Sequence, residues 1–243
     1  MKKATIALLV ICTAVFAQQK GTFTDTRDKK TYKTVKIGEQ TWMAENLNYN
    51  AEGSRCNGED GEVEAIIGYD KDDYFITKTK TLPSSKVQAN CAKYGRLYDW
   101  ATAMNIDAKF NETKWTGKDV KHNGVCPKGW HLPNDKEWKT LRSSVSGYGV
   151  VGDEVVQNEL KATSGWEYMG KSGNGTDGYG FTALPGGMGG KWYNGFGGSG
   201  EKGFWWSSTS YDNGAHIYGL IHRNSSGNSI NKSDLLSVRC VQD

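Results

Sequence analysis

Cysteine usage constrains this chain most strongly, and the N-terminus indicates which cysteines matter. Two lysines at positions 2 and 3 precede an apolar run from Ile6 to Phe16, and Ala17 completes a small-residue cleavage pattern. An export signal has this order, and the run is shorter than the about 20 apolar residues that cross a bilayer. We therefore predict a signal peptide over residues 1–17, cleavage near Ala17, and a secreted or outer-cell-surface protein.

Removal of this leader leaves four cysteines, which are Cys56, Cys91, Cys126 and Cys240. An even number of cysteines in an exported chain indicates two disulfides, and four cysteines allow three connectivities. No two of them are spaced as Cys-x-x-Cys, so the sequence supports neither a zinc knuckle nor a thioredoxin-like motif. The residues after the leader are therefore expected to fold around covalent staples.

Composition favours an irregular fold with large aromatic anchors. The chain has 31 glycines and 9 tryptophans but only 4 prolines, and residues 18–243 show no internal repeat or linker. This composition predicts one loop-rich domain over residues 18–243, long enough to bury a sizeable core. Lysine and arginine nearly balance the acidic residues after the leader and form no polybasic run, so nucleic acid is not an expected partner. No transmembrane segment is expected in the mature chain.

Periodicity predicts strands and two or three short helices. Residues 31–37 and 40–44 read as strands, and residues 50–90 as an acidic, turn-rich surface excursion tied down by cysteines. Asn134 and Glu137 form a capping-box pattern ahead of an apolar stripe, which predicts a helix. The other expected elements are helices at 99–105 and 154–162 and strands at 179–184, 204–209, 215–221 and 235–241. The glycine-dense residues 186–203 are expected to form no regular element.

Four ordered blocks of sequence carry a family resemblance. They are Tyr32–Gly38 with Trp42–Tyr49; Cys91–Tyr98; Cys126–Trp138; and Tyr179–Gly187 with Trp206–Ser208 and Val238–Val241. Together they resemble the FISUMP family, the Fibrobacter succinogenes major paralogous domain, over nearly all of the mature chain. The resemblance implies membership but no particular activity.

A more distant resemblance concerns the fold. The segment Trp130–Trp138 and the closing Val238–Val241 are similar to the C-type-lectin-like fold as used by sulfatase-modifying-factor domains. This implies a loop-rich α+β unit with two or three short helices packed on antiparallel strands, terminal strands that pair, and Cys126 bonded to Cys240. Cys56 then pairs with Cys91. The loops closed span 114 and 35 residues, for which chain entropy gives about 5 and about 4 kcal/mol.

The residues give little support for catalysis. Chemistry of the sulfatase-modifying type needs reactive late cysteines, whereas Cys240 is expected to be bridged. His216 and His222 are six apart and share a strand face only if the strand is unbroken, and Gly219 between them invites a bend. His131 is expected to be a packing residue hydrogen-bonded to backbone. We therefore predict no enzyme and name no catalytic residue.

Calcium is the one cofactor that the lectin resemblance brings into consideration, and no specific motif supports it. Serines at 207 and 208 stand where the lectin family places an Asn-Asp ligand pair. The segments Asn174–Gly178 and Asp70–Asp73 carry oxygen ligands, but neither matches an EF-hand loop and turns explain both equally well. We predict no cofactor and leave a metal site open.

The best candidates for ligand binding lie in an aromatic loop. Trp192, Tyr193, Asn194 and Phe196 are placed between glycines in a segment without periodicity. Rings on such loops stack on the apolar faces of sugars, but for Trp192 and Phe196, each taken alone, burial as a plug of the core is the favoured alternative, because tryptophan is mostly buried on average. The tryptophans inside the four blocks that carry the family resemblance are expected in the core; they are Trp42, Trp130, Trp138 and Trp206.

Three functions follow from these patterns, in order of preference. The first is a non-catalytic binding module for glycans such as plant cell-wall polysaccharide. The second is an envelope structural or adhesion protein that binds protein partners. The third is an enzyme with a site that no motif reveals. The sequence gives no oligomeric state.

Overall fold

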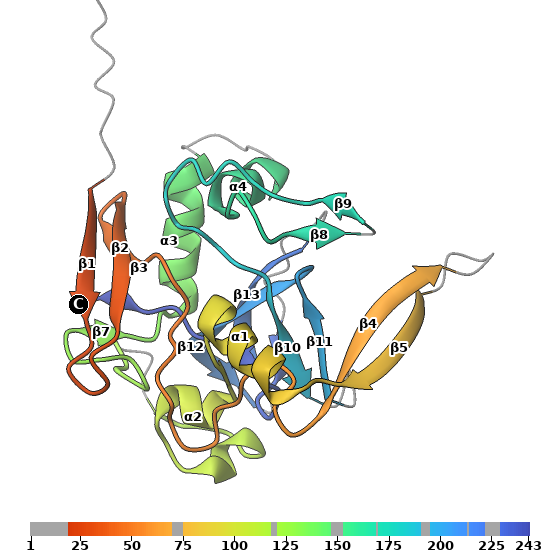
Figure 1. Cartoon of the computed structure of the whole chain (residues 1–243). Coiled ribbons are helices and arrows are strands. Elements are labelled where there is room, and N and C mark those ends of the chain that lie inside the picture. The colour runs from red at the N-terminus through yellow and green to blue at the C-terminus, as the bar shows by residue number, and fades with distance from the viewer. Residues whose placement is uncertain are drawn as a thin grey trace, which may run out of the picture.

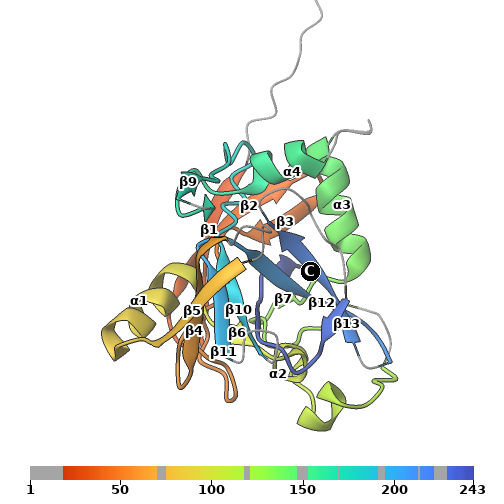
Figure 2. The ribbon, with the colours of Figure 1, turned by 90° about the vertical axis from the view of Figure 1, so that its right-hand side faces the viewer.

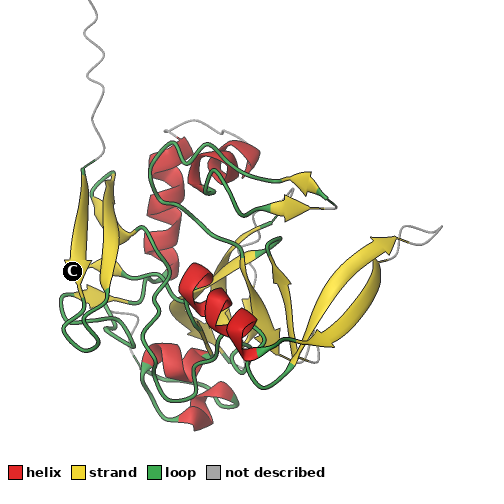
Figure 3. Cartoon of the chain, in the orientation of Figure 1, coloured by secondary structure: helices red, strands yellow, loops and turns green. Residues whose placement is uncertain are grey.

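Strands dominate the chain, and helices cover parts of their edges and ends (Figures 1 and 3). The computed structural model describes residues 19–69, 75–117, 121–146, 153–168, 170–190, 195–212, 214–221 and 229–243. The predicted signal peptide lies outside these ranges. Within them, no helix combines the length and apolar character needed to cross a membrane.

A smaller sheet joins the two ends of the described chain. Its strands in spatial order are β1 (Lys20–Thr24), β2 (Thr31–Ile37), β3 (Gln40–Met43), β16 (Val241–Gln242) and β7 (Trp130–His131). Val241 lies between Trp42 of β3 and His131 of β7, antiparallel to both. The disulfide between Cys126 and Cys240 lies directly before β16. The first and last strands therefore belong to one sheet beside this disulfide, but β16 pairs with β3 and β7 and not with β1, so the predicted pairing of the terminal strands was wrong in this detail.

A larger sheet forms the body of the molecule. Its main path is β14 (Ser229–Asn231), β13 (Gly214–Leu220), β12 (Gly203–Tyr211), β10 (Gly186–Gly190), β11 (Gly195–Ser199), β4 (Glu62–Tyr69) and β5 (Phe75–Thr81). Two short strands extend it beside β12; they are β15 (Leu236–Ser237) and β6 (Leu97–Tyr98). A separate hairpin consists of β8 (Glu167–Tyr168) and β9 (Lys171–Ser172).

The β4–β5 ribbon protrudes from this body (Figure 1). Its base is attached through parallel pairing of β4 with β11, where Val63 faces Phe196. The second disulfide, Cys56–Cys91, closes the stretch of chain that contains the ribbon. The expected excursion over residues 50–90 is therefore tied down as predicted, but it is built of strands and part of a helix rather than of turns.

Four α-helices and one 3-10 helix occur in the described residues. They are α1 (Ser84–Tyr94), α2 (Trp100–Met104), the 3-10 helix η1 (Ala108–Asn111), α3 (Asp135–Ser146) and α4 (Asp153–Leu160). The last three α-helices were predicted, and the capping box is formed: Asn134 Oδ1 accepts from the Glu137 N–H, and Glu137 Oε2 accepts from the Asn134 N–H. Helix α1 lies at the base of the β4–β5 ribbon (Figure 2) and was not predicted. These elements confirm a loop-rich α+β fold with two disulfides.

Tryptophans fill both large clusters of the core. One cluster surrounds Trp100 and Trp206, and the other contains Trp42, Trp138 and Trp205. The four tryptophans predicted to be core residues are all buried. The Trp138 ring also stacks on Tyr218, with centroids 4.7 Å apart and planes 2° from parallel. Rings of this size explain how a glycine-rich chain buries enough apolar surface to fold.

Three element predictions in the late half of the chain were wrong. The strand expected over residues 235–241 is divided into β15 in the larger sheet and β16 in the smaller sheet. Residues 186–203 contain β10 and β11 instead of an irregular segment, and residues 179–184 make only one isolated bridge, at Ala183. In β10, a Cβ added at Gly187 would lie 2.3 Å from the backbone oxygen of Gly197 on β11. These glycines are therefore a requirement for close pairing of the two strands, and not a sign that strands are absent.

Candidate binding site

Of the four predicted ligand-binding residues, the structure describes only Phe196. Phe196 is buried, at 5% exposure, and packs with Val63 and Leu97. Its ring therefore faces the core, the alternative that the sequence had left open for it. Trp192, Tyr193 and Asn194 lie outside the described residues.

The segment 191–194 joins β10 to β11, and the glycines on either side of it, Gly190 and Gly195, belong to these two strands. Gly190 and Gly195 face each other at the end of this hairpin. A Cβ on Gly195 would lie 2.4 Å from the backbone oxygen of Glu62, so only glycine fits against β4 at this point. Gly195, the residue that follows the aromatic segment, therefore lies beside Glu62.

An open groove of about 710 Å³ begins at the same place. We call it the acidic groove because Glu59, Asp60 and Glu62 line one stretch of it. Arg96 and Gln88 add planar polar groups, and Leu82 and Val87 add apolar surface. Val87 and Gln88 belong to helix α1, Leu82 precedes that helix, and Arg96 lies between α1 and β6. Its volume falls in the range typical of small-molecule sites.

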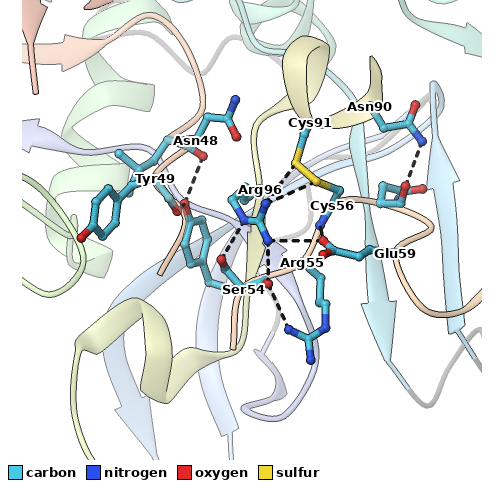
Figure 4. Close-up of a disulfide and its surroundings, with 12 residues drawn as sticks. Asn48, Tyr49, Ser54, Arg55, Cys56, Glu59, Asn90, Cys91 and Arg96 are labelled. Atoms are coloured by element: carbon cyan, nitrogen blue, oxygen red, sulfur yellow. Dashed lines mark hydrogen bonds and ion pairs between the residues drawn. A yellow bond between two sulfur atoms is a disulfide. The ribbon is translucent and has the colours of Figure 1, made fainter. Parts of the chain in front are cut away.

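Arg96 organises the wall of this groove around the Cys56–Cys91 disulfide (Figure 4). Its Nη1 lies 3.4 Å from Cys56 Sγ and 3.6 Å from Cys91 Sγ. Its Nη2 donates to the Ser54 carbonyl at 2.9 Å and lies 3.3 Å from Glu59 Oε2, which also accepts from the Cys56 N–H. Contacts with the disulfide, the Ser54 carbonyl and Glu59 therefore hold the guanidinium in place. This wall of the groove is preorganised for a ligand.

His131 is a site residue whose partners the sequence did not reveal. It was expected to bond to backbone, but its Nδ1 lies 2.7 Å from Asp243 Oδ1 and its Nε2 lies 2.8 Å from Glu137 Oε1. Burial acts to raise the pKa of Glu137, but hydrogen bonds from His131 and the Asn134 N–H outweigh it and hold that pKa below its ordinary value. Because His131 is only 1% exposed, this cluster ties α3 to the smaller sheet rather than presenting a reactive group.

Lys161 is a buried lysine beside a pocket of about 230 Å³. Its Nζ donates to the Ile221 carbonyl at 2.9 Å and lies 4.5 Å from the centroid of the Trp166 ring. Burial lowers the pKa of Lys161 to about 8. The amine is thus committed to packing contacts.

The possible calcium ligands serve structural roles where they can be seen. Asn174 Oδ1 accepts from the Trp166 N–H, and Asp177 accepts from both the N–H and the hydroxyl of Thr182. Ser207 and Ser208 are both buried. Asp70–Asp73 and His222 lie outside the described residues, and no group of three or more potential metal ligands forms within them.

Comparison with known proteins adds a family. The family model described as the Fibrobacter succinogenes major domain matches residues 35–242. The chain belongs to this family. The match to the Fibrobacter succinogenes major domain includes both disulfides and the acidic groove, whereas β1 precedes it. No curated protein and no solved structure matches the chain, so the likeness to C-type lectins stays a prediction.

Proposed function

We propose that this protein is exported and binds glycans, such as plant cell-wall polysaccharide, without transforming them. The observation that carries the proposal is the position of the acidic groove. It is lined by Glu62, whose backbone oxygen lies beside Gly195, the described residue that follows Asn194 in the chain. The proposal assigns the ring faces of the site to Trp192 and Tyr193, which lie outside the described residues, and the polar contacts to the groove.

The chemistry of the groove supports a hydroxyl-rich ligand. Carboxylates of Glu59, Asp60 and Glu62 accept hydrogen bonds, while the Gln88 amide and the Arg96 guanidinium donate them. Sugar hydroxyls are both donors and acceptors, so one sugar can satisfy both sets. Leu82 and Val87 supply apolar contact for the C–H faces of a sugar ring.

The aromatic segment supplies the second part of the site in this proposal. Phe196 belongs to the core, so stacking is assigned to Trp192 and Tyr193 alone. A stacked ring commonly contributes about 1 kcal/mol beyond the area that it buries. Two rings and a polar groove are sufficient for the weak, multivalent binding that polysaccharides permit.

Binding of the purified, oxidised protein to insoluble cellulose and xylan tests the proposal. The parent protein is compared with the Trp192→Ala/Tyr193→Ala variant and with Glu62→Ala in the groove. We expect binding by the parent, and loss of binding in both variants with no change in melting temperature.

A matched control uses a tryptophan outside the site. Trp115 is partly buried and packs edge-on against Trp100, with centroids 5.8 Å apart, far along the chain from the groove. Trp115→Phe should leave binding unchanged. Absence of binding to every polysaccharide by the intact, folded parent would refute a glycan-binding function.

A protein-binding function is the second candidate, and one feature favours it. β5 is the last strand of the larger sheet and protrudes with β4 (Figure 1). A free strand edge can accept a strand from a partner. Capture of one envelope protein by the parent, and not by a variant with Thr79→Pro in β5, would support this adhesion role.

A further inference from the structure

The acidic groove lies within one closed ring of chain. The Cys56–Cys91 disulfide closes this ring at one end, and the ladder pair of Glu62 on β4 with Thr81 on β5 closes it at the other. We call it the cystine ring; its two arms are residues 56–62 and 81–91. Among the described residues that line the groove, all except Arg96 belong to these arms. The shape of the groove therefore depends on both closures.

Arg96, the lining residue outside the ring, is placed by the same disulfide. Its Nη1 lies 3.4 Å from Cys56 Sγ and 3.6 Å from Cys91 Sγ (Figure 4). Its Nη2 lies 3.3 Å from Glu59 Oε2, and this carboxylate also accepts from the Cys56 N–H at 2.6 Å. A displacement of Cys56 therefore displaces two of the polar groups that the groove offers to a ligand.

Helix α1 forms most of the second arm and has little packing of its own. Among its eleven residues, only Cys91 and Tyr94 are buried. A hydrogen bond from Asn90 Nδ2 to the Asn57 carbonyl, at 2.9 Å, also crosses the ring beside the disulfide. Segments with few buried contacts are the first to open in a folded protein. The covalent bond at Cys91 is therefore central to holding α1 against the first arm.

The surroundings of this disulfide favour its exchange with thiols. Cys56 and Cys91 are 6% and 9% exposed, and Cys56 lines the groove. Cys126 and Cys240, in contrast, are buried in one of the two tryptophan-rich core clusters. Because Arg96 contacts both sulfurs of the first pair, either sulfur can leave as a thiolate beside a positive charge.

We propose that the Cys56–Cys91 disulfide is a redox switch for the acidic groove, which binds its ligand when the bond is closed and releases it when a thiol reductant opens the bond. A thiolate attacks one sulfur, the S–S bond breaks, and the other sulfur leaves as a thiolate beside Arg96. A second thiol then attacks the mixed disulfide. Two electrons thus pass from two reductant thiols, which become a disulfide, and their two protons end on Cys56 and Cys91. This inference concerns the regulation of the groove and rests on the proposed glycan-binding function.

Amide hydrogen exchange and binding to insoluble xylan, measured on the whole protein with the bond closed and open, test the inference. Dithiothreitol is raised until alkylation and mass spectrometry find Cys56 and Cys91 reduced and the other pair intact. Exchange in residues 57–62 and 84–91 should then rise about tenfold, while exchange in β2 stays the same. Xylan affinity should fall about tenfold because the groove is no longer preorganised, and reoxidation should restore both properties.

A matched variant opens the ring without a reductant. Cys56→Ser/Cys91→Ser keeps the bond between Cys126 and Cys240, and should reproduce the faster exchange and the weaker binding. Slow exchange in β2 shows that this variant is folded. The same concentration of dithiothreitol should have no further effect on it, which separates opening of the ring from any other action of the reductant.

The outcomes distinguish the switch from the function on which it rests. Unchanged exchange in the cystine ring after opening, or xylan binding that survives opening, refutes the switch. If exchange rises but the oxidised parent binds no polysaccharide, the glycan-binding function is refuted, whereas the dependence of the groove on the disulfide is supported.

Discussion

The guanidinium of Arg239 lies 2.8 Å from Oδ1 of Asn46, a residue 193 positions earlier in the chain. Arg239 is fully buried, and burial lowers its pKa to about 9. It has carbonyl contacts at Phe181 and Thr182, and its Cζ lies 4.3 Å from the Phe181 ring centroid. Asn46 also accepts from Trp205 Nε1 at 2.8 Å. One amide thus joins the early part of the chain to β12 and to the segment between β15 and β16.

Replacement of Asn46 by alanine is expected to lower the free energy of unfolding by about 3 to 5 kcal/mol. The change removes the side-chain acceptor of a buried charge and the donor to the Tyr94 carbonyl. Urea denaturation of both proteins measures the effect. Asn50 is exposed, so Asn50→Ala should stay within about 0.5 kcal/mol of the parent. A similar small effect of Asn46→Ala would show that Arg239 is satisfied without it.

The two disulfides should open in a defined order as dithiothreitol is raised. Cys56 and Cys91 are 6% and 9% exposed, against 2% and 0% for Cys126 and Cys240, and Arg96 lies beside both sulfurs of the first pair. A guanidinium stabilises the thiolate that reduction produces. Alkylation followed by mass spectrometry should therefore find Cys56 and Cys91 labelled first. Arg96→Met should raise the dithiothreitol concentration needed for this pair and leave the other pair unchanged; simultaneous opening of both pairs would contradict the prediction.

Glu137 should give the protein part of its sensitivity to acid. The pKa of Glu137 is held below its ordinary value in the folded state, so its stabilising contribution is present above an unfolded value of 4.5 and is lost as pH falls through the folded value. Glu137→Gln is expected to cost about 1 to 3 kcal/mol at pH 7 and progressively less in acid. Denaturation at pH 7 and pH 3.5 measures both quantities. Glu39→Gln, at an exposed site, serves as the control, and a cost for Glu137→Gln that does not change with pH would count against the argument.

Lys161 should produce a trend of the same sign in the alkaline range. Its pKa is lowered by burial to about 8 from 10.5, so between these values the unfolded chain binds more protons than the folded chain. The stability of the parent relative to Lys161→Met should therefore rise as pH increases from 8 to 10.5, and should be constant below 8. Urea denaturation of both proteins at pH 7, 9 and 10 tests the slope. A flat difference would indicate that the amine stays charged throughout.

The sequence predicted the parts of the fold in which side-chain patterns coincide with burial. Residues 31–37 alternate, and β2 occupies that range with Tyr32, Val35 and Ile37 buried. The disulfide pairing followed from the resemblance and is confirmed. Helix α1 was missed because only Cys91 and Tyr94 among its eleven residues are buried, which leaves no apolar stripe to detect.

The candidate site was harder to predict because its parts meet only in the folded chain. Glu62, Gln88 and Arg96 show no shared pattern, and they line one groove only because a disulfide and a parallel strand pair bring them together. Phe196 resembles the neighbouring aromatic residues in sequence, yet it packs into the core because the β11 register turns it toward Val63. His131 gave no hint of Asp243, which lies 112 residues away.

The two disulfides also determine what a single backbone cleavage would do. A cut between Cys56 and Cys91, or between Cys126 and Cys240, leaves every fragment linked to the rest through a cystine. Residues 92–125 belong to neither loop, so a cut there divides the protein into two pieces with no covalent bond between them. Helix α2 lies in that stretch, and Trp100, Ala103 and Met104 of this helix are buried in the core. Proteolytic survival of the whole molecule therefore depends on the part of the chain that is protected by packing alone.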